Sequence, residues 1–205
     1  MNKITEKNNI LTSNIDRNNI EQILNIINKE DSLLHQKIHV EIPKIAKIVE
    51  CVVNSFNKGG RLFYIGCGTS GRLGVLDAVE CPPTFSTNKN MVQGLIAGGK
   101  KAMIESVENA EDSENDGKKI ILKKNISNID TVIGITASGN TKFVLSALKT
   151  AKKLKATTCL ICSNNIDKDW YVDYIIKIIV GSEIITGSTR MKSGTSIKMI
   201  LNMIS

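Results

Sequence analysis

Short apolar runs and amphipathic stretches alternate along most of the chain. The apolar runs are rich in β-branched residues and predict strands at 61–66, 91–99, 130–136, 156–162 and 173–181. The amphipathic stretches predict helices at 69–80, 101–124 and 141–154, and a last helix from about Met191 onward. Strands that alternate with helices form right-handed βαβ units, and strands that are apolar throughout are buried on both faces. The pattern therefore predicts an α/β fold, a three-layer α/β/α sandwich around a mostly parallel five-stranded sheet.

The first part of the chain has a different pattern. Residues 1–16 are polar and are expected to form an extended arm. From Asp16, which can serve as an N-cap, to about Asn57, apolar residues recur at helical spacing. Pro43 suits a helix N-terminus, and Gly59 with Gly60 ends the helical region. We therefore expect two parts, an N-terminal arm with helices over 1–57 and an α/β domain over 58–205.

Composition narrows the class of protein. The chain of 205 residues is 41% hydrophobic and 23% charged, which excludes a disordered chain, a collagen and a membrane bundle. The first residues lack the apolar region of a secretion signal, so a cytoplasmic protein without membrane partners is expected. The net charge is 27 − 20 = +7, but the lysines are dispersed and aromatic residues make up only 4%. This pattern does not favour a nucleic-acid partner.

Cysteines and histidines offer two weak metal signals. Five cysteines, an odd number, are expected to be reduced thiols. Cys159 and Cys162 form a CxxC, which reads either as part of a buried strand or as a redox or zinc site, and the apolar run around it favours the strand. His35 and His39 lie one helical turn apart but have no third ligand, so they are expected to be surface residues. No metal and no cofactor are expected.

Three loops rich in glycine and hydroxyl residues follow predicted strands. They are Gly66–Arg72, Thr136–Thr141 and Gly187–Thr195, and none has the Walker A ending or the dinucleotide spacing. Ligands of open α/β sheets bind beyond the carboxyl ends of the strands, where such loops and helix N-termini can hold phosphate. Each loop alone could be a simple helix cap. Together they favour a phosphate-type ligand, with candidate contacts at Thr69, Ser70, Gly71, Arg72, Ser138, Gly139, Asn140, Thr141, Ser188, Thr189 and Arg190, the amides of Gly71 and Gly139 included.

Charged residues near these loops leave alternatives open. Arg72 and Arg190 could bind phosphate or carboxylate in a bidentate way, or could form ion pairs within the protein. Glu80 lies between apolar residues before Pro82-Pro83, and we expect it to be partly buried at a helix end, where a raised pKa suits a general acid. Glu111 lies in an acidic stretch, most of which is expected to be solvated surface.

Several motifs taken together resemble one family. They are GCGTSGRLGVLDAVECPPTF, GLIAGG, ESVENAEDSE, TASGNTKFVLSALKTAK and GSTRMKSGT, with ITEKNN and NIINKEDSLL before them. In this order they resemble the N-acetylmuramic acid 6-phosphate etherase family of the sugar isomerase (SIS) superfamily, over about Ile4 to Ser205. The resemblance implies an SIS-type, flavodoxin-like domain.

The resemblance also implies a reaction. Family members cleave the D-lactyl ether of N-acetylmuramic acid 6-phosphate in peptidoglycan amino-sugar recycling. Elimination and hydration yield N-acetylglucosamine 6-phosphate and D-lactate without metal or nucleotide. The two catalytic glutamates of the family fall on Glu80 and Glu111, 31 residues apart. Glucokinase regulatory protein is similar to the family and binds fructose phosphates without catalysis, so a non-catalytic phosphosugar-binding module remains an alternative.

The chain departs from the family at two places. TEKNN stands in the arm where the family commonly has Thr-Glu followed by Arg-Asn. Family members continue past LNMIS into a C-terminal helical region, so we expect a shortened chain, and an inactive remnant is a third alternative.

The resemblance to SIS domains, which generally pair, implies a homodimer with sites at or near the subunit interface, and surplus apolar residues independently favour pairing. The N-terminal helices and the last helix carry more apolar surface than one sheet layer needs, at Ile20, Ile23, Leu24, Ile27, Ile42, Ile45, Ile48, Val49, Ile197, Met199, Ile200 and Met203. The alternative is that both helical regions pack on their own sheet.

Overall fold

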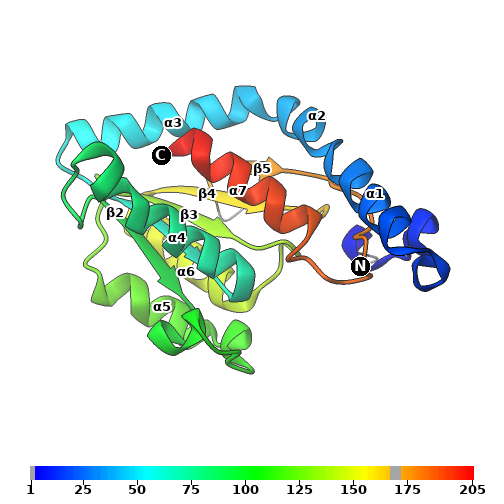
Figure 1. Cartoon of the computed structure of the whole chain (residues 1–205). Helices are drawn as coiled ribbons and strands as arrows, with labels where there is room; N and C mark the ends of the chain where they lie inside the picture. Colours follow the sequence, from blue (N-terminus) through cyan, green and yellow to red (C-terminus); the bar gives the residue numbers. More distant parts are fainter. Residues whose placement is uncertain (1–2, 167–171) are drawn as a thin grey trace.

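The computed structural model describes residues 3–166 and 172–205, and it confirms the predicted fold class (Figure 1). Its five strands form one parallel sheet in the order β2-β1-β3-β4-β5. The strands are β1 Leu62–Gly66, β2 Val92–Ile96, β3 Thr131–Ile135, β4 Thr157–Cys162 and β5 Tyr174–Lys177. The helices are α1 Ile20–Asp31, α2 Leu34–His39, α3 Ile42–Asn57, α4 Gly68–Phe85, α5 Glu114–Lys123, α6 Lys142–Lys153 and α7 Lys192–Ile204.

Helices cover both faces of the sheet, because alternate residues of each strand point to opposite sides. On one face, Tyr64 and Ile133 pack with α3, α4 and α7. On the other, Phe63 and Val132 pack with α5 and α6. Cys159 and Cys162 are fully buried in β4, which confirms the strand interpretation of the CxxC.

The N-terminal region differs from the expected extended arm. Three short 3-10 turns precede α1, at Ile4–Glu6, Ile10–Thr12 and Ile15–Arg17. The expected N-cap at Asp16 is wrong, because Asn19 caps α1 in a capping box with Gln22. Within α3, Ile45 and Ile48 are buried, whereas Ile20 and Leu24 of α1 are exposed by 78% and 60%. The helices after residue 19 therefore pack partly on the sheet and partly leave apolar surface open.

Two helix predictions also need correction. The predicted helix over 101–124 is restricted to α5, and 3-10 turns at Gly99–Met103 and Ala110–Asp112 lie before it in a polar connection. The helix predicted to end near Glu80 continues through Pro82 and Pro83 to Phe85. These prolines lack the amides that would bond to the carbonyls one turn back, but they lie in the last turns, where little helix remains to be broken.

Two findings bear on cofactors and membranes. Within residues 3–166 and 172–205, no helix is both long and apolar enough to cross a bilayer. Over the same residues, no group of three or more His, Cys, Asp and Glu side chains is placed to hold a metal ion. His35 and His39 are exposed on α2, as expected of surface residues.

Candidate functional site

A cleft of about 880 Å³ opens at the carboxyl edge of the sheet. Its walls come from the start of α4, the turn between β3 and α6, the connection before α5, the N-terminal arm and the segment before α7. The predicted site residues that line it are Thr69, Ser70, Arg72, Glu111, Ser138, Asn140, Thr141 and Thr189. The structure thus brings residues from all three predicted loops to one cleft.

The junction of β1 and α4 forms the first wall. A Cβ on Gly66 would lie 2.6 Å from the amide nitrogen of Gly71, so this close approach requires glycine. It lets α4 begin directly at the strand end, where amides of the first helical turn have no partner within the helix. Gly71 itself donates its amide to the Cys67 carbonyl at 3.2 Å, so the expectation that this amide assists a ligand is not supported.

The turn between β3 and α6 carries a cluster of hydroxyl groups. The Thr136 hydroxyl lies 2.7 Å from the Thr141 hydroxyl and 3.1 Å from that of Ser138. Gly139, at a φ of +77°, permits the turn, and its amide donates to the Thr136 carbonyl at 3.2 Å rather than to a ligand. Hydroxyls next to the N-terminus of a 12-residue helix suit an anionic group.

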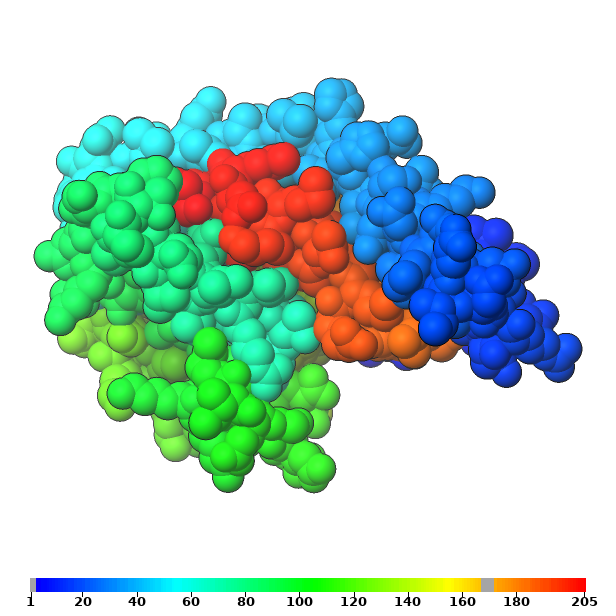
Figure 2. All heavy atoms as spheres, viewed as in Figure 1, coloured from blue at the N-terminus to red at the C-terminus, as the bar shows by residue number. Residues whose placement is uncertain are grey.

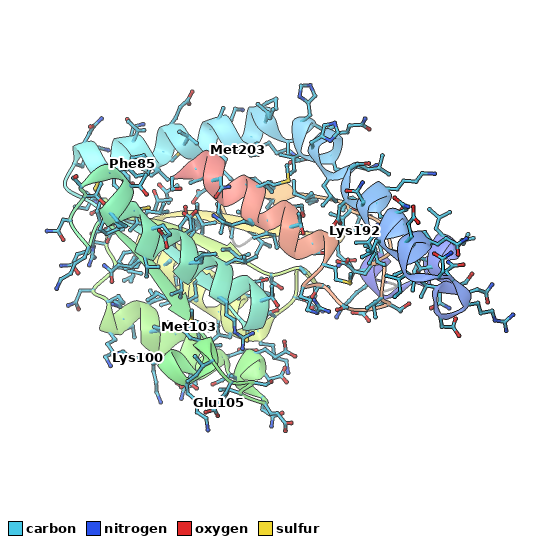
Figure 3. All side chains as sticks on the ribbon, viewed as in Figure 1. Phe85, Lys100, Met103, Glu105, Lys192 and Met203 are labelled. Carbon is cyan, nitrogen blue, oxygen red and sulfur yellow. The ribbon has the colours of Figure 1, made fainter. Side chains whose placement is uncertain are left out.

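Arg72 holds the connection that follows β2. Its guanidinium donates to the carbonyls of Met103, at 3.3 Å, and Glu105, at 2.9 Å, two residues labelled in Figure 3. The sequence left open whether Arg72 binds a ligand or forms an ion pair within the protein. The structure shows contacts within the protein, but with backbone carbonyls rather than with a carboxylate. Arg72 still lines the cleft, whereas Arg190 is exposed and does not.

Glu111 reaches the cleft from the 3-10 turn Ala110–Asp112. The turn is tied to the start of α6, because Asp112 forms an ion pair with Lys142 at 3.2 Å. Burial raises the pKa of the Cys67 thiol, and the charge of Glu111 raises it further, which places Glu111 near the end of β1. The sequence interpretation of most of this acidic stretch as surface agrees with the exposure of Glu108, Glu111 and Asp112, and the fold places all three in the wall of the cleft.

Glu80 does not line the cleft. It lies on α4 eight residues beyond Arg72, which corresponds to roughly 12 Å along the helix axis. It is exposed, so the expected partial burial at a helix end is wrong for this chain taken alone. Its neighbours Val79 and Leu76 are exposed by 57% and 42%.

The segment before α7 is fixed by buried charges. Glu183 is fully buried and accepts hydrogen bonds from the amides of Lys192, at 2.9 Å, and Ser193, at 3.0 Å. The Lys192 ammonium lies 2.5 Å from the carboxylate of Glu30 on α1, and Figure 3 shows Lys192 at this junction. Gly187 and Thr189 consequently line the cleft, whereas Ser188 does not.

Sequence reasoning missed several residues of the cleft. Lys3 and Glu6 line it from the arm, and Lys142 lines it from α6. Thr5 and Glu6 of the arm enter the sequence analysis only through the family resemblance. A polar segment without periodicity does not indicate which part of the fold it packs against.

Comparisons with known proteins agree with this geometry. Residues 44–152 match the family described as the glucokinase regulatory protein N-terminal SIS domain. The chain is 52% identical over 203 residues to an N-acetylmuramic acid 6-phosphate etherase of Clostridium acetobutylicum, covering 98% of this chain and 67% of the relative. It is 48% identical over 202 residues to the etherase of a Geobacillus strain, covering 98% and 68%.

A solved structure shows the same fold at low identity. The phosphoheptose isomerase of Neisseria gonorrhoeae superposes with a TM-score of 0.61 and 15% identity, covering 90% of this chain and 97% of that one. The chain spans about two thirds of the length of the etherases it matches. Because nearly all of it aligns with them at about half identity, the chain belongs to the N-acetylmuramic acid 6-phosphate etherase family of SIS-domain proteins.

Proposed function

We propose that the cleft binds N-acetylmuramic acid 6-phosphate and cleaves its D-lactyl ether to give N-acetylglucosamine 6-phosphate and D-lactate. The observation that carries the proposal is that the hydroxyl cluster of Thr136, Ser138 and Thr141 and the carboxylate of Glu111 line one cleft. Hydroxyls and helix N-termini suit the phosphate, and a carboxylate suits proton transfer. Membership of the etherase family supplies the substrate.

The reaction follows from the chemistry of the open-chain sugar. The C2 proton is acidic because it is adjacent to the aldehyde, and Glu111 removes it. The C3–O bond then breaks with its electrons going to lactate, which Glu80 protonates, and an unsaturated aldehyde remains. Water then adds across the double bond, with its hydroxyl going to C3 and a proton to C2, which restores the saturated sugar. General acid and base groups of this kind typically contribute about 10²- to 10⁴-fold each to the rate.

A second copy of the chain would bring Glu80 to a cleft. Within one chain it lies outside the cleft, so we propose a homodimer in which Glu80 enters the partner's cleft. Leu76, Val79 and Phe85 on the same helix α4 are also exposed, and exposed apolar surface is typical of an interface. Ile20 and Leu24 on α1 are further exposed apolar residues available for pairing.

Release of D-lactate from the phosphosugar tests the function. The protein is expected to release it, and Glu111→Gln is expected to slow release by about 10² or more while leaving binding of N-acetylglucosamine 6-phosphate unchanged. Glu50→Gln, an exposed residue of α3 outside the cleft, is the matched control and keeps full activity. Binding without any lactate release would favour the non-catalytic phosphosugar module, an alternative supported by the match to the regulatory protein's SIS domain.

Mixing two inactive variants tests the shared site. Random pairing of Glu80→Gln with Glu111→Gln chains gives mixed dimers in which one of two clefts holds both glutamates, so about a quarter of the activity should return. Mixing Glu111→Gln with Glu111→Ala is the control and should restore none. If the first mixture also stays inactive, Glu80 does not act across an interface.

A further inference from the structure

The N-terminal arm, defined here as residues 3–12, is built into the wall of the cleft. Thr5 is fully buried, and its amide donates to the Asn164 side-chain oxygen at 3.3 Å. The Asn164 amide group donates back to the Thr5 hydroxyl at 2.9 Å, and the Thr5 carbonyl accepts from the Gly187 amide at 3.1 Å. These three bonds fix the 3-10 turn Ile4–Glu6 against the rest of the fold.

Thr5 also joins two of the loops that form the cleft. Asn164 donates to the Ala137 carbonyl at 2.9 Å, next to the hydroxyl cluster, and Gly187 belongs to the segment before α7. Farther along the arm, the Thr12 hydroxyl donates to the Ile184 carbonyl at 2.8 Å. In Figure 2 the blue arm lies directly against the orange segment that precedes α7. The arm thus has a defined position relative to both loops.

Glu6 follows this anchor and lines the cleft. A Cβ on Gly187 would lie 3.0 Å from a carboxylate oxygen of Glu6, so the glycine leaves the space that the carboxylate occupies. Asp112, another carboxylate of the cleft, is paired with Lys142. Among residues 3–166 and 172–205, no side chain forms an ion pair or hydrogen bond with the carboxylate of Glu6.

We propose that Glu6 is a specificity-determining substrate contact that accepts hydrogen bonds from hydroxyl or amide N–H groups of the sugar. This inference rests on the proposed phosphosugar site. A carboxylate is negatively charged and therefore repels phosphate. It has acceptors and no donors, so it pairs with neutral donors. The hydroxyl cluster and helix N-termini take the phosphate at the other wall. The two walls therefore recognise two different parts of one ligand.

Two ligands separate this role from a structural one. N-acetylglucosamine 6-phosphate carries sugar donors and phosphate, whereas propyl phosphate carries the phosphate alone. Glu6→Ala should weaken binding of the sugar phosphate by about 10-fold or more, as removal of a hydrogen bond to a charged group does. Binding of propyl phosphate should stay the same or tighten slightly, because a negative charge is lost. Glu6→Gln keeps one acceptor and should fall between wild type and Glu6→Ala.

Glu50→Gln is the control and should match wild type for both ligands. Equal weakening of both ligands by Glu6→Ala would indicate that Glu6 only supports the wall, and an unchanged affinity for the sugar phosphate would show that it makes no contact; either result overturns the inference. If wild type binds neither ligand, the phosphosugar site fails and this inference fails with it. Failure of the phosphosugar site is distinguishable from failure of the Glu6 inference alone, because wild-type binding is measured before any variant.

Discussion

Polar residues gather at both edges of the sheet, but they are used differently. At the amino edge, Asp130 is 1% exposed and accepts hydrogen bonds from the amides of Arg61, at 2.8 Å, and Ser127, at 2.9 Å. The Arg61 guanidinium lies 2.9 Å from the same carboxylate. At the carboxyl edge, the hydroxyls of Thr136, Ser138 and Thr141 contact one another and line an open cleft.

A second aspartate repeats the pattern at the amino edge. Asp173, just before β5, accepts from the amide and hydroxyl of Thr158 at 3.0 and 2.8 Å and pairs with Lys152. Each aspartate therefore joins the start of its strand to a neighbouring strand. At the amino edge carboxylates bond to neighbouring strands and stabilise the sheet, whereas at the carboxyl edge the hydroxyls bond to one another beside an open cleft, where they can also contact a ligand. The difference predicts that mutations at the two edges affect different properties.

The largest effect is expected from Asp130→Ala. Removing a buried carboxylate leaves the Arg61 guanidinium and two amides without their partner, which should lower the free energy of unfolding by about 3 kcal/mol. Thermal denaturation should show a midpoint lower by roughly 10 °C. Affinity for N-acetylglucosamine 6-phosphate, measured at a temperature where the variant is folded, should be unchanged. A fall in affinity without loss of stability would contradict the division between the edges.

Ser138→Ala should show the opposite behaviour. Loss of one hydroxyl from the cluster is expected to raise KM about 10-fold, with a smaller change in kcat, because contacts to phosphate form in the ground state and the transition state alike. The half-exposed hydroxyl contributes little to folding, so the unfolding midpoint should stay close to that of wild type. An unaltered KM would place the phosphate elsewhere.

The smallest effect is a pH dependence of stability at the amino edge. Burial alone would raise the pKa of Asp130, but hydrogen bonds from Arg61 and Ser127 outweigh it and hold the pKa below the ordinary value of 3.8. A carboxylate with a lowered folded-state pKa stabilises the protein fully above the unfolded-state pKa, and this contribution is lost as pH falls through the folded-state value. Urea unfolding should therefore show a loss of stability below about pH 4, and Asp130→Asn should reduce this slope.

The sequence predicted the five strands, their mostly parallel arrangement and the three loops, because buried strands and glycine-rich turns have local signals. It predicted less well which residues line the cleft where long-range contacts determine their position. Glu111 is exposed, as its acidic stretch predicts, and the fold also places it in the wall of the cleft. Thr5 and Glu6 lie in a segment without periodicity, which Asn164 fixes from 159 residues away. No local pattern reports such contacts.

Glu80 shows the converse case. Its apolar neighbours and the following prolines made it a candidate, but its burial was inferred from neighbours in sequence. On α4 those neighbours, Val79 among them, point outward with it. An apolar stretch on a helix does not say whether the apolar side faces the core of its own chain or a second copy.

Amide chemical shifts of the labelled protein during titration with N-acetylglucosamine 6-phosphate test the central claim most directly. The account predicts saturable shifts in Gly68–Arg72, Thr136–Thr141 and Gly187–Thr189, all at the carboxyl edge, and in the arm around Glu6. Amides around Arg61, Asp130 and Asp173 should not move. Shifts centred on the amino edge, or no saturable shift at any concentration, would contradict the assignment of the carboxyl-edge cleft as a phosphosugar site.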